Sequence, residues 1–532
     1  MISRRSFLAL SAAGAAGAAG CVARPAPIAA DGTTLRFGSA AGDDHTYDPR
    51  ITMTGSEEQV IVQVFDRLLA KGADDSFLPY LAKSWQVAPD HRAVTLQLRD
   101  DVTFHDGTPF DAQAVKYTFD TIVDPKTGSM GAIDVVGPYA GADILGPHEI
   151  RLRFATPFPR VLSALADNKA SIVSPTAARR LGVSGFGQAP VGSGPFRFVS
   201  WRRGVQVVLA RNPDYRWGPA DLPVGPPRIA KVVHRFIPNA WTRIAALDAG
   251  EIDACEQAPP LDLRRMTQTG RYRALAGDTV GVPYGFSLNS SRGAFADVRV
   301  RRAFMMAIDR PWISQNLLFG QVHTAWGPLA SSAPEYWKGV EAYYRFDHAA
   351  ASQLLDQAGW RMGPGGVRRK AGQPLSIYLP ILLEPQIGVA LQAFAKRVGF
   401  DFRIEQVTHE KQEELIFANA YDLLSLHWTL PDAGVLEVPF LSGNVPGAGK
   451  FSFNWSRYQS PALDKLLVAA AASPGAQRVE LYHQVQRTIM DQAIFLPIHE
   501  NTYNVVHAAR LSGLRLTGGN SQTVLAGAVL SS

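Results

Sequence analysis

Cysteine is almost absent from this chain of 532 residues, which carries only Cys21 and Cys255. Since one of the two lies close to the N-terminus, we expect no internal disulfide in the mature fold and no zinc site built from paired cysteines. Cys255 follows Ile252-Asp253-Ala254 and has no nearby histidine or second cysteine. This setting predicts a small buried side chain rather than a nucleophile or a metal ligand.

Long hydrophobic runs and a strong excess of one charge are also lacking. Beyond Cys21, no stretch approaches the roughly 18 uninterrupted apolar residues of a membrane-spanning helix. The net charge is +6, and Arg4 and Arg5 account for two of these charges, which leaves +4 for the rest of the chain. So small an excess over so long a chain argues against a nucleic-acid partner. Its length and its 46% hydrophobic content predict about two or three domains with sizeable cores.

Catalytic motifs are missing as well. The sequence has no H-E-x-x-H, paired C-x-x-C or G-x-S-x-G motif, and Phe451 follows Gly447-Ala448-Gly449-Lys450, which excludes a phosphate-binding loop. His105-Asp106 has the residue types of a general base and its partner. Adjacent residues do not readily orient one another, however, so a structural turn is the simpler interpretation. We therefore expect no enzyme, no cofactor and no resident metal.

The N-terminus has the pattern of an export leader, and residues 1–30 are predicted to be a signal and linker. Ser3-Arg4-Arg5-Ser6-Phe7-Leu8 is typical of a twin-arginine (Tat) signal, and the small-residue stretch from Phe7 to Ala19 is too short to span a membrane. Ala18-Ala19-Gly20-Cys21 is similar to a lipoprotein box, which predicts lipidation of Cys21. Ordinary cleavage nearer Ala30 is the alternative. Both routes predict a periplasmic protein, with or without a membrane anchor.

Residues 79–124 carry the clearest local pattern in the chain. Val94, Leu96 and Leu98 alternate with polar residues, which is the period of a half-buried strand. Asp106-Gly107 marks a turn, and Asp111 is a good N-cap for the helix that follows. Strand, turn and capped helix predict a structural unit without a catalytic role. The apolar face of the helix comprises Val115, Phe119, Ile122 and Val123.

Within this stretch, AKSWQVAPD…LQLRDDVTFHDGTPFDAQAVKYTFD closely resembles the signature region of the family 5 extracellular solute-binding proteins. These are the dipeptide- and oligopeptide-binding proteins of ABC importers, with nickel- and glutathione-binding relatives. Further segments are similar to the family in the same order, so the resemblance spans roughly residues 34–516. They include Tyr47-Asp48-Pro49, Gly192-Ser193-Gly194-Pro195-Phe196, Asn212-Pro213-Asp214-Tyr215, residues 245–253 and residues 298–309.

The resemblance implies an α/β fold, namely the two-lobed periplasmic binding protein fold of the large type, whose lobes close on a ligand about a hinge. Lobe I would comprise residues 31–279 with an extra subdomain at about 50–185, and the C-terminal segment 497–532 would return to it. Lobe II would comprise residues 280–496. Local patterns predict strands at 34–38, 150–154, 375–379, 400–407 and 421–428, and helices at 57–69, 350–360 and 391–398.

The predicted strand at 421–428 also suggests a ligand site, because ligands of open α/β sheets gather outside the carboxyl ends of strands. This strand leads through His427, Trp428 and Thr429 to Asp432. Peptide-binding members of the family commonly place an aspartate here for the ligand's amino terminus, but Leu430 and Pro431 occupy that position. A free amino terminus is therefore in doubt as the recognised group. Asp432 is either a ligand contact or a loop cap, and Trp428 lines either the pocket or the core.

The remaining candidate ligand contacts follow from position alone. Small residues packed as in Gly192-Ser193-Gly194 either build a turn or allow a backbone to approach a ligand. Arg197 stands where a dinucleotide-binding motif needs glycine or alanine, so that motif is excluded. The full set of these candidates is Tyr47, Gly192, Ser193, Gly194, Asn289 and Trp326.

Together these observations predict an exported receptor of an ABC importer. It would act as a monomer that captures a peptide-like or other small polar solute and passes it to permease subunits in the inner membrane. A receptor for a nickel chelate, haem, an opine or a sugar on the same fold is one alternative. A periplasmic hydrolase or a chaperone is another, and the sequence shows no serine, cysteine or metal cluster suited to a hydrolase.

Overall fold

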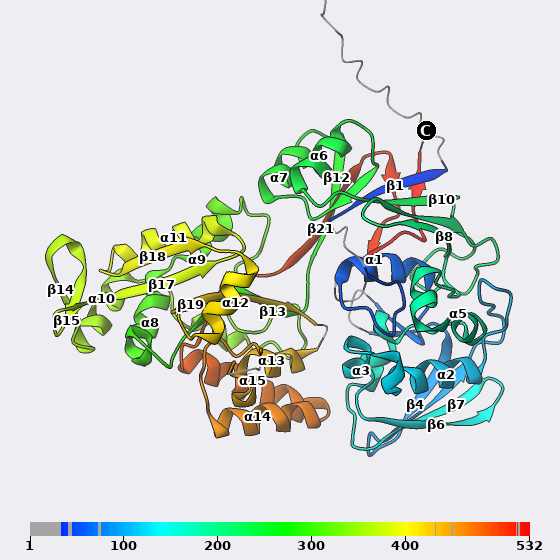
Figure 1. Ribbon diagram of the computed structural model, residues 1–532, viewed down its shortest axis with the longest axis horizontal. Coiled ribbons are helices and arrows are strands. Elements are labelled where there is room, and N and C mark those ends of the chain that lie inside the picture. Colours follow the sequence, from blue (N-terminus) through cyan, green and yellow to red (C-terminus); the bar gives the residue numbers. More distant parts are fainter. Residues whose placement is uncertain are drawn as a thin grey trace, which may run out of the picture.

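The computed structural model describes residues 33–40, 45–72, 76–430, 432–447, 451–517, 519 and 522–531. They form two lobes that lie side by side (Figure 1), which is the two-lobed α/β fold that the sequence predicts. The leader, including Cys21, lies outside the described residues, so the export route and the lipidation stay predictions. Within the described ranges, no helix has the length and apolar character needed to span a bilayer.

Lobe I is built on a seven-stranded mixed sheet in the order β12-β21-β11-β1-β10-β9-β8. β1 is parallel to both of its neighbours, and its residues Leu35 and Phe37 are fully buried. The C-terminal segment completes this sheet, because β21 pairs antiparallel with β11 and β12 (Figure 1). The strands are β1 (Thr34–Ser39), β8 (Phe196–Arg202), β9 (Gln206–Arg211), β10 (Lys231–Phe236), β11 (Ala254–Glu256), β12 (Tyr272–Asp278) and β21 (Thr502–Ala508).

Helix α1 (Gly55–Val64) packs its apolar side into the core beside this sheet. A capping box starts the helix, in which the Thr54 side chain accepts from the backbone N–H of Glu57 while the Glu57 side chain accepts from that of Thr54. The sequence predicts a helix over 57–69, but α1 ends at Val64. The backbone of Phe65 is extended. The N–H of Gly194 donates to the Val64 carbonyl oxygen at 2.9 Å, so this carbonyl bonds to a distant segment and not to a further turn of the helix.

The predicted extra subdomain contains a four-stranded antiparallel sheet in the order β4-β5-β7-β6. Val94, Leu96 and Leu98 of β5 are buried, as their alternation predicts. Asp111 caps α2 by accepting from the N–H of Ala114 at 2.9 Å, which confirms the predicted cap. The elements are β4 (Ala82–Val87), β5 (Ala93–Leu98), β6 (Tyr139–Gly146), β7 (Glu149–Phe154), α2 (Ala112–Val123), α3 (Gly131–Val136), α4 (Val161–Leu165) and α5 (Pro175–Gln188).

Lobe II has a central sheet in which β13 (Gly281–Leu288) lies between β19 (Leu423–Thr429) and β20 (Phe495–His499). All eight residues of β13 are buried. A parallel pair, β17 (Ser376–Ile381) and β18 (Asp401–Gln406), extends the lobe outward (Figure 1). The main helices are α8 (Val298–Ala307), α10 (His348–Gln357), α11 (Pro385–Lys396), α12 (His409–Phe417), α14 (Pro461–Ala472) and α15 (Gly475–Asp491).

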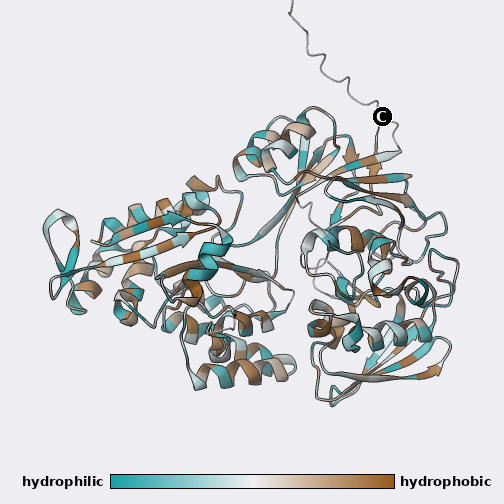
Figure 2. Ribbon diagram, in the orientation of Figure 1, coloured by the Kyte–Doolittle hydropathy of each residue, from teal (hydrophilic) through white to brown (hydrophobic). Residues whose placement is uncertain are grey.

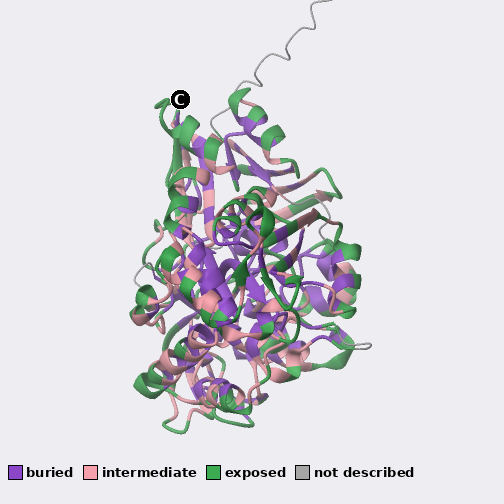
Figure 3. Cartoon of the chain, turned by 90° about the vertical axis from the view of Figure 1, so that its left-hand side faces the viewer, coloured by how far each residue is buried: buried purple, intermediate pink, exposed green. Residues whose placement is uncertain are grey.

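Each lobe has hydrophobic cores of its own. No core cluster of the described residues mixes residues before Asp278 with residues of β13 to β20. Hydrophobic and hydrophilic residues alternate along many strands (Figure 2), and buried residues lie in the interior while exposed ones lie outside (Figure 3). Lobes with separate cores can move relative to each other as rigid units, because this motion exposes none of their hydrophobic cores to solvent.

The chain crosses between the lobes twice, from β12 to β13 and from β20 to β21. The first crossing runs from Asp278 to Gly281 and the second from His499 to Thr502. Gly281 has a φ of +147°, and a Cβ there would lie 1.9 Å from the carbonyl oxygen of Trp428, so this crossing requires glycine. The lobe boundaries predicted at 279/280 and 496/497 lie near these crossings, and the limits of each lobe stay a prediction.

Candidate ligand-binding site

A cavity of about 830 Å³ lies between the lobes and is lined by residues of both. Lobe I contributes the start of α1, residues 166–169 and the loop before α7 (Pro260–Thr267). Lobe II contributes the end of β19 with Glu384 and His499, while Thr279 and Asn501 of the two crossings also reach the cavity. Its volume lies within the range of about 300–1,000 Å³ that is typical of small-molecule sites.

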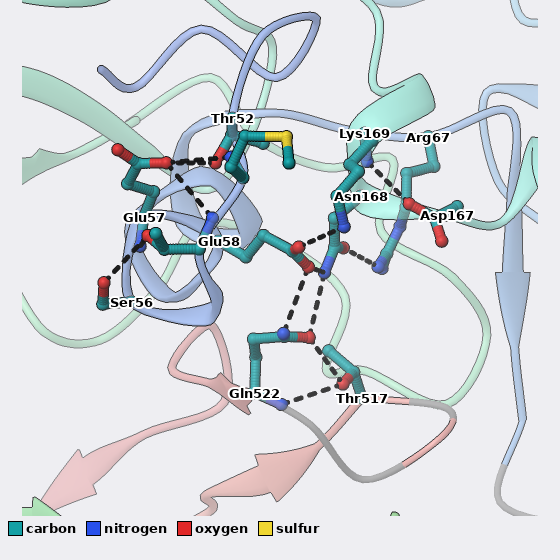
Figure 4. Close-up of polar contacts among 12 residues, drawn as sticks. Thr52, Ser56, Glu57, Glu58, Arg67, Asp167, Asn168, Lys169, Thr517 and Gln522 are labelled. Carbon is teal, nitrogen blue, oxygen red and sulfur yellow. Dashed lines mark hydrogen bonds and ion pairs between the residues drawn. The ribbon is translucent and has the colours of Figure 1, made fainter. Parts of the chain in front are cut away.

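The lobe I wall is a network of polar side chains centred on Glu58 (Figure 4). Lys169 Nζ donates to Glu58 Oε1 at 2.5 Å, and the side-chain amides of Asn168 and Gln522 donate to Oε2 at 3.1 and 3.2 Å. Burial alone lowers the pKa of Lys169, but the charges of Glu58 and Asp167 outweigh it and leave this pKa raised. This part of the wall therefore holds a fixed ion pair rather than a free charge.

Arg67 belongs to the same wall and donates from Nη1 to Asn168 Oδ1 at 2.5 Å (Figure 4). The residues of the wall come from distant parts of the chain. Glu58 lies in α1, Asn168 lies in the short helix at 168–170, and Gln522 lies near the C-terminus. Sequence reasoning missed this whole wall. Its one available signal was the polar run Asp167-Asn168-Lys169 before an apolar segment, which is too common to identify a site.

The lobe II wall carries aromatic and imidazole rings. His427, Trp428 and Thr429 line the cavity, as expected for the end of this strand. His499 stacks on Tyr284 with ring centroids 5.0 Å apart, and its Nε2 lies 3.5 Å from Glu384 Oε1. Burial lowers the pKa of His427, while Glu384 raises it and His499 lowers it further. The pKa of His427 therefore lies below its ordinary value, which favours the neutral ring.

Gly192, Ser193 and Gly194 do not line this cavity. A Cβ on Gly192 would lie 2.2 Å from the carbonyl oxygen of Val64, and one on Gly194 would lie 2.6 Å from the carbonyl carbon of Val64. Ser193 is buried and its Oγ donates to Asp66 Oδ2 at 2.8 Å. Of the two interpretations open for these small residues, the structure supports a close backbone approach, but to the end of α1 rather than to a ligand.

Three further candidates also lie away from the cavity, so their predicted ligand contacts lack support from the geometry. Tyr47 is buried and meets Trp201 edge to face at 4.6 Å. Asn289 is buried and donates from Nδ2 to Asn419 Oδ1 at 2.7 Å and to a backbone carbonyl. Trp326 packs against the lobe II core beneath the guanidinium of Arg310, 4.7 Å from its ring centroid.

Asp432 acts as a loop cap, which is one of its two predicted roles. Its Oδ1 accepts from the N–H of Gly434 at 2.7 Å, and Arg478 Nη2 donates to both of its oxygens at 2.8 Å. Asp432 lines a separate cavity of about 290 Å³ between lobe II and the subdomain. Because its charge is already paired, this carboxylate is not available to the amino terminus of a ligand in the main cavity.

The remaining reactive side chains have structural roles. His105 Nε2 lies 3.0 Å from the carbonyl oxygen of Gly194, and burial lowers its pKa to about 4. Asp106 accepts from Ser174 Oγ at 2.6 Å, so the pair holds a turn against neighbouring segments. Burial raises the pKa of the Cys255 thiol to about 12. Across the described part of the chain, no three histidine, cysteine, aspartate or glutamate side chains meet as a metal site.

Glu500, in the second crossing, is a buried carboxylate with one unpaired oxygen. Its Oε1 accepts from the N–H of Ser331 at 3.1 Å, while Oε2 finds no donor among the described residues. Burial, together with the negative charge of Asp278, raises its pKa from 4.5 to about 7. Because the folded-state pKa lies above that of the unfolded chain, the stabilisation by this group is full below about pH 4.5 and is lost as the pH rises to about 7.

We expect Glu500→Gln to remove this pH dependence. The wild type should lose up to about 3 kcal/mol of unfolding free energy through this group between about pH 4.5 and 8, because each tenfold change in the protonation equilibrium is worth about 1.4 kcal/mol. Urea unfolding at several pH values measures the effect. Glu405→Gln, an exposed site with a lowered pKa, serves as the control and should leave the profile unchanged over this range. An identical profile for Glu500→Gln and the wild type would contradict the assignment.

Comparisons with known proteins point to the same kind of protein as the sequence resemblance does. A model of the family described as "Bacterial extracellular solute-binding proteins, family 5 Middle" matches residues 76–438. The nickel-binding periplasmic protein of Escherichia coli (strain K12) is 27% identical over 487 residues, which cover 88% of each chain. The probable D,D-dipeptide-binding periplasmic protein DdpA of the same strain is 26% identical over 90% of each. The crystal structure of NikA from Brucella suis with Fe(III)-EDTA superposes with a TM-score of 0.81 at 24% identity, over 94% of this chain and 100% of that one.

Proposed function

Because the chain belongs to the bacterial extracellular solute-binding proteins of family 5, we propose that the cavity between its lobes captures a peptide-like or other small polar solute for an ABC importer. The protein would act in the periplasm as a monomer, exported by the Tat route and anchored through Cys21. It would hand the solute, chemically unchanged, to permease subunits in the inner membrane. The resemblance over residues 34–516 and the family match support this interpretation.

The observation that carries the proposal is a cavity lined by two lobes that have separate cores and are joined, in the described part of the chain, by two short crossings. A solute that touches both walls favours the closed arrangement, because contacts with the second wall form only when the lobes approach. A permease can then distinguish loaded from empty receptor by shape. This capture cycle needs no catalytic residue.

Two solute classes are suggested by the names of relatives, which are described as binding nickel or a D,D-dipeptide. For a peptide, the anchor for the amino terminus differs from the family's usual aspartate, since Arg478 already pairs with Asp432. A metal chelate is the second candidate, and His427 favours it, because a neutral imidazole on the cavity wall offers a nitrogen to a metal that arrives with its own chelator. Haem, an opine or a sugar stay further alternatives on the same fold.

Native mass spectrometry of the exported protein after incubation with an extract of small solutes tests the proposal. We expect a bound solute that is released unchanged on unfolding, and a radius of gyration in solution scattering that falls when it binds. Absence of saturable binding, or chemical conversion of the bound solute, would contradict a receptor role. Nickel or iron recovered together with an organic chelator would decide in favour of the metal-chelate candidate.

Trp428→Ala is expected to weaken binding of the recovered solute at least tenfold, or by about 1.4 kcal/mol. The substitution removes a large ring from the cavity wall, where it meets Phe453 edge to face at 4.7 Å. Calorimetric titration measures the affinity. Trp241→Ala is the matched control, because Trp241 is 69% exposed and does not line the cavity. Equal affinities of the two variants would remove Trp428 from the site.

A further inference from the structure

Arg67 differs from the other charged residues of the lobe I wall because no carboxylate of the described residues pairs with it. Its Nη1 donates to Asn168 Oδ1, and its guanidinium lies 5.9 Å from the ring centroid of Tyr80. Its Nε is buried and has no acceptor among the described residues. Among the described residues, neither Nε nor Nη2 has an acceptor, and these two nitrogens form the edge with which arginine binds a carboxylate through two hydrogen bonds.

The carboxylates nearest to Arg67 are already occupied. Asp66, the preceding residue, is fully buried and accepts from Tyr80, from Ser193 Oγ and from Trp217 Nε1, the last two at 2.8 Å. On the cavity side, Glu58 accepts from Lys169, Asn168 and Gln522. Both carboxylates therefore already accept hydrogen bonds from donors other than Arg67.

A second guanidinium, that of Arg515, lies close enough to Arg67 for the two charges to interact. Arg515 pairs with Asp221 at its Nη1, while its Nε is buried without an acceptor among the described residues. Burial lowers the pKa of Arg515, and the charge of Arg67 lowers it further. Arg515 has Asp221 as its anion, whereas Arg67, which lines the cavity, pairs with no carboxylate of the described residues, so an anion brought by a solute would also lower the repulsion between the two guanidinium groups.

The opposite wall indicates how such a solute would be oriented. Glu384 of lobe II lies near His499 and also lines the cavity, so a negative group would be repelled there. The anionic end of a solute therefore fits the lobe I side, and a neutral or positive end fits the lobe II side.

We propose that Arg67 is a specificity-determining residue that binds an anionic group of the solute through its Nε and Nη2 edge, so that the receptor selects carboxylate-bearing solutes. This inference rests on the proposed function, since it assigns the cavity between the lobes to a transported solute. It names one chemical requirement of that solute. It leaves open whether the carboxylate belongs to a peptide or to a chelator.

Calorimetric titration of the exported full chain with two matched pairs of probes tests the inference. The first pair is a pool of tripeptides with free carboxyl termini and the same pool amidated, and the second is citrate and its neutral triamide. In at least one pair, we expect the anionic member to bind at least tenfold more tightly. Arg67→Met should abolish this preference, so that the anionic and neutral members of each pair bind with similar affinity.

Two further variants control for folding and for overall charge. Arg67→Gln keeps a donor for Asn168 and removes the charge, so it should also lose the preference even if Arg67→Met folds poorly. Arg403→Met removes a cation that is 72% exposed and should keep the preference. Binding of no anionic probe by the wild type, equal binding within both pairs, or a preference that survives in Arg67→Gln overturns the inference. Capture of a neutral solute from an extract would overturn it too, while leaving the receptor function intact.

Discussion

Replacing Arg478 with methionine is expected to lower the free energy of unfolding by about 3–5 kcal/mol, the usual cost of removing one partner from a buried ion pair. Arg478 Nε donates to Glu335 Oε1 at 2.8 Å, and its Nη2 donates to both oxygens of Asp432. All three side chains are about nine-tenths buried. Without the guanidinium, two carboxylates would remain close together in a poorly solvated place, and the face of Tyr482 would lose its cation.

Urea unfolding at pH 7, followed by tryptophan fluorescence, measures this change. Arg403→Met is the matched control, because Arg403 pairs with Glu405 at the surface of lobe II, and its loss should leave the free energy of unfolding close to that of the wild type. A loss below about 1 kcal/mol for Arg478→Met would show that Glu335 and Asp432 are solvated without their partner. That result would argue against Asp432 as a loop cap whose charge depends on pairing with Arg478.

Asp66→Ala is expected to destabilise the protein by roughly 3–6 kcal/mol, because its carboxylate accepts three hydrogen bonds in a fully buried place, from Tyr80, Ser193 and Trp217. Alanine would leave Ser193 and Trp217 without this acceptor and would leave Tyr80 only the hydroxyl of Tyr215, and each buried donor left without an acceptor costs about 1–3 kcal/mol. Thermal and urea unfolding of the purified variant measure the loss.

Asp66→Asn separates the loss of hydrogen bonds from the loss of charge. An asparagine oxygen can still accept from Ser193 and Trp217, while its amide group can donate to one of the neighbouring tyrosine hydroxyl groups. We therefore expect less than half of the loss seen with alanine. Equal losses in both variants would mean that the negative charge itself, rather than the acceptor, stabilises this site.

Much of the fold could be predicted from the sequence because its determinants are local. The alternation of Val94, Leu96 and Leu98 and the capping position of Asp111 need only neighbouring residues, and the structure confirms both. The helix predicted over 57–69 shows the limit of this reasoning. Its apolar pattern continues beyond Val64, but the chain at Gly194 meets the carbonyl oxygen of Val64 and the helix ends there.

Sequence reasoning placed residues on only one wall of the candidate site, the lobe II wall. His427, Trp428 and Thr429 follow one another at the end of a strand, so the rule for strand ends found them together. The lobe I wall joins Glu58 and Arg67 to Asn168 and Gln522, and no local pattern links residues so far apart. For Asn289 and Trp326 the opposite holds. Their positions along the chain suggested ligand contacts, but their side chains pack away from the cavity.

The sequence by itself indicated the family and the α/β class through the resemblance of its motifs. It also predicted individual strands, caps and turns, because these depend on neighbouring residues. Tertiary structure alone decided which polar groups face the cavity and which are already paired. Asp432 is neutralised by a residue 46 positions away, whereas Arg67 pairs with no carboxylate in the part of the chain that the structure describes. Recognition depends on such unmatched groups, and whether a charge is matched is settled only when distant segments pack together.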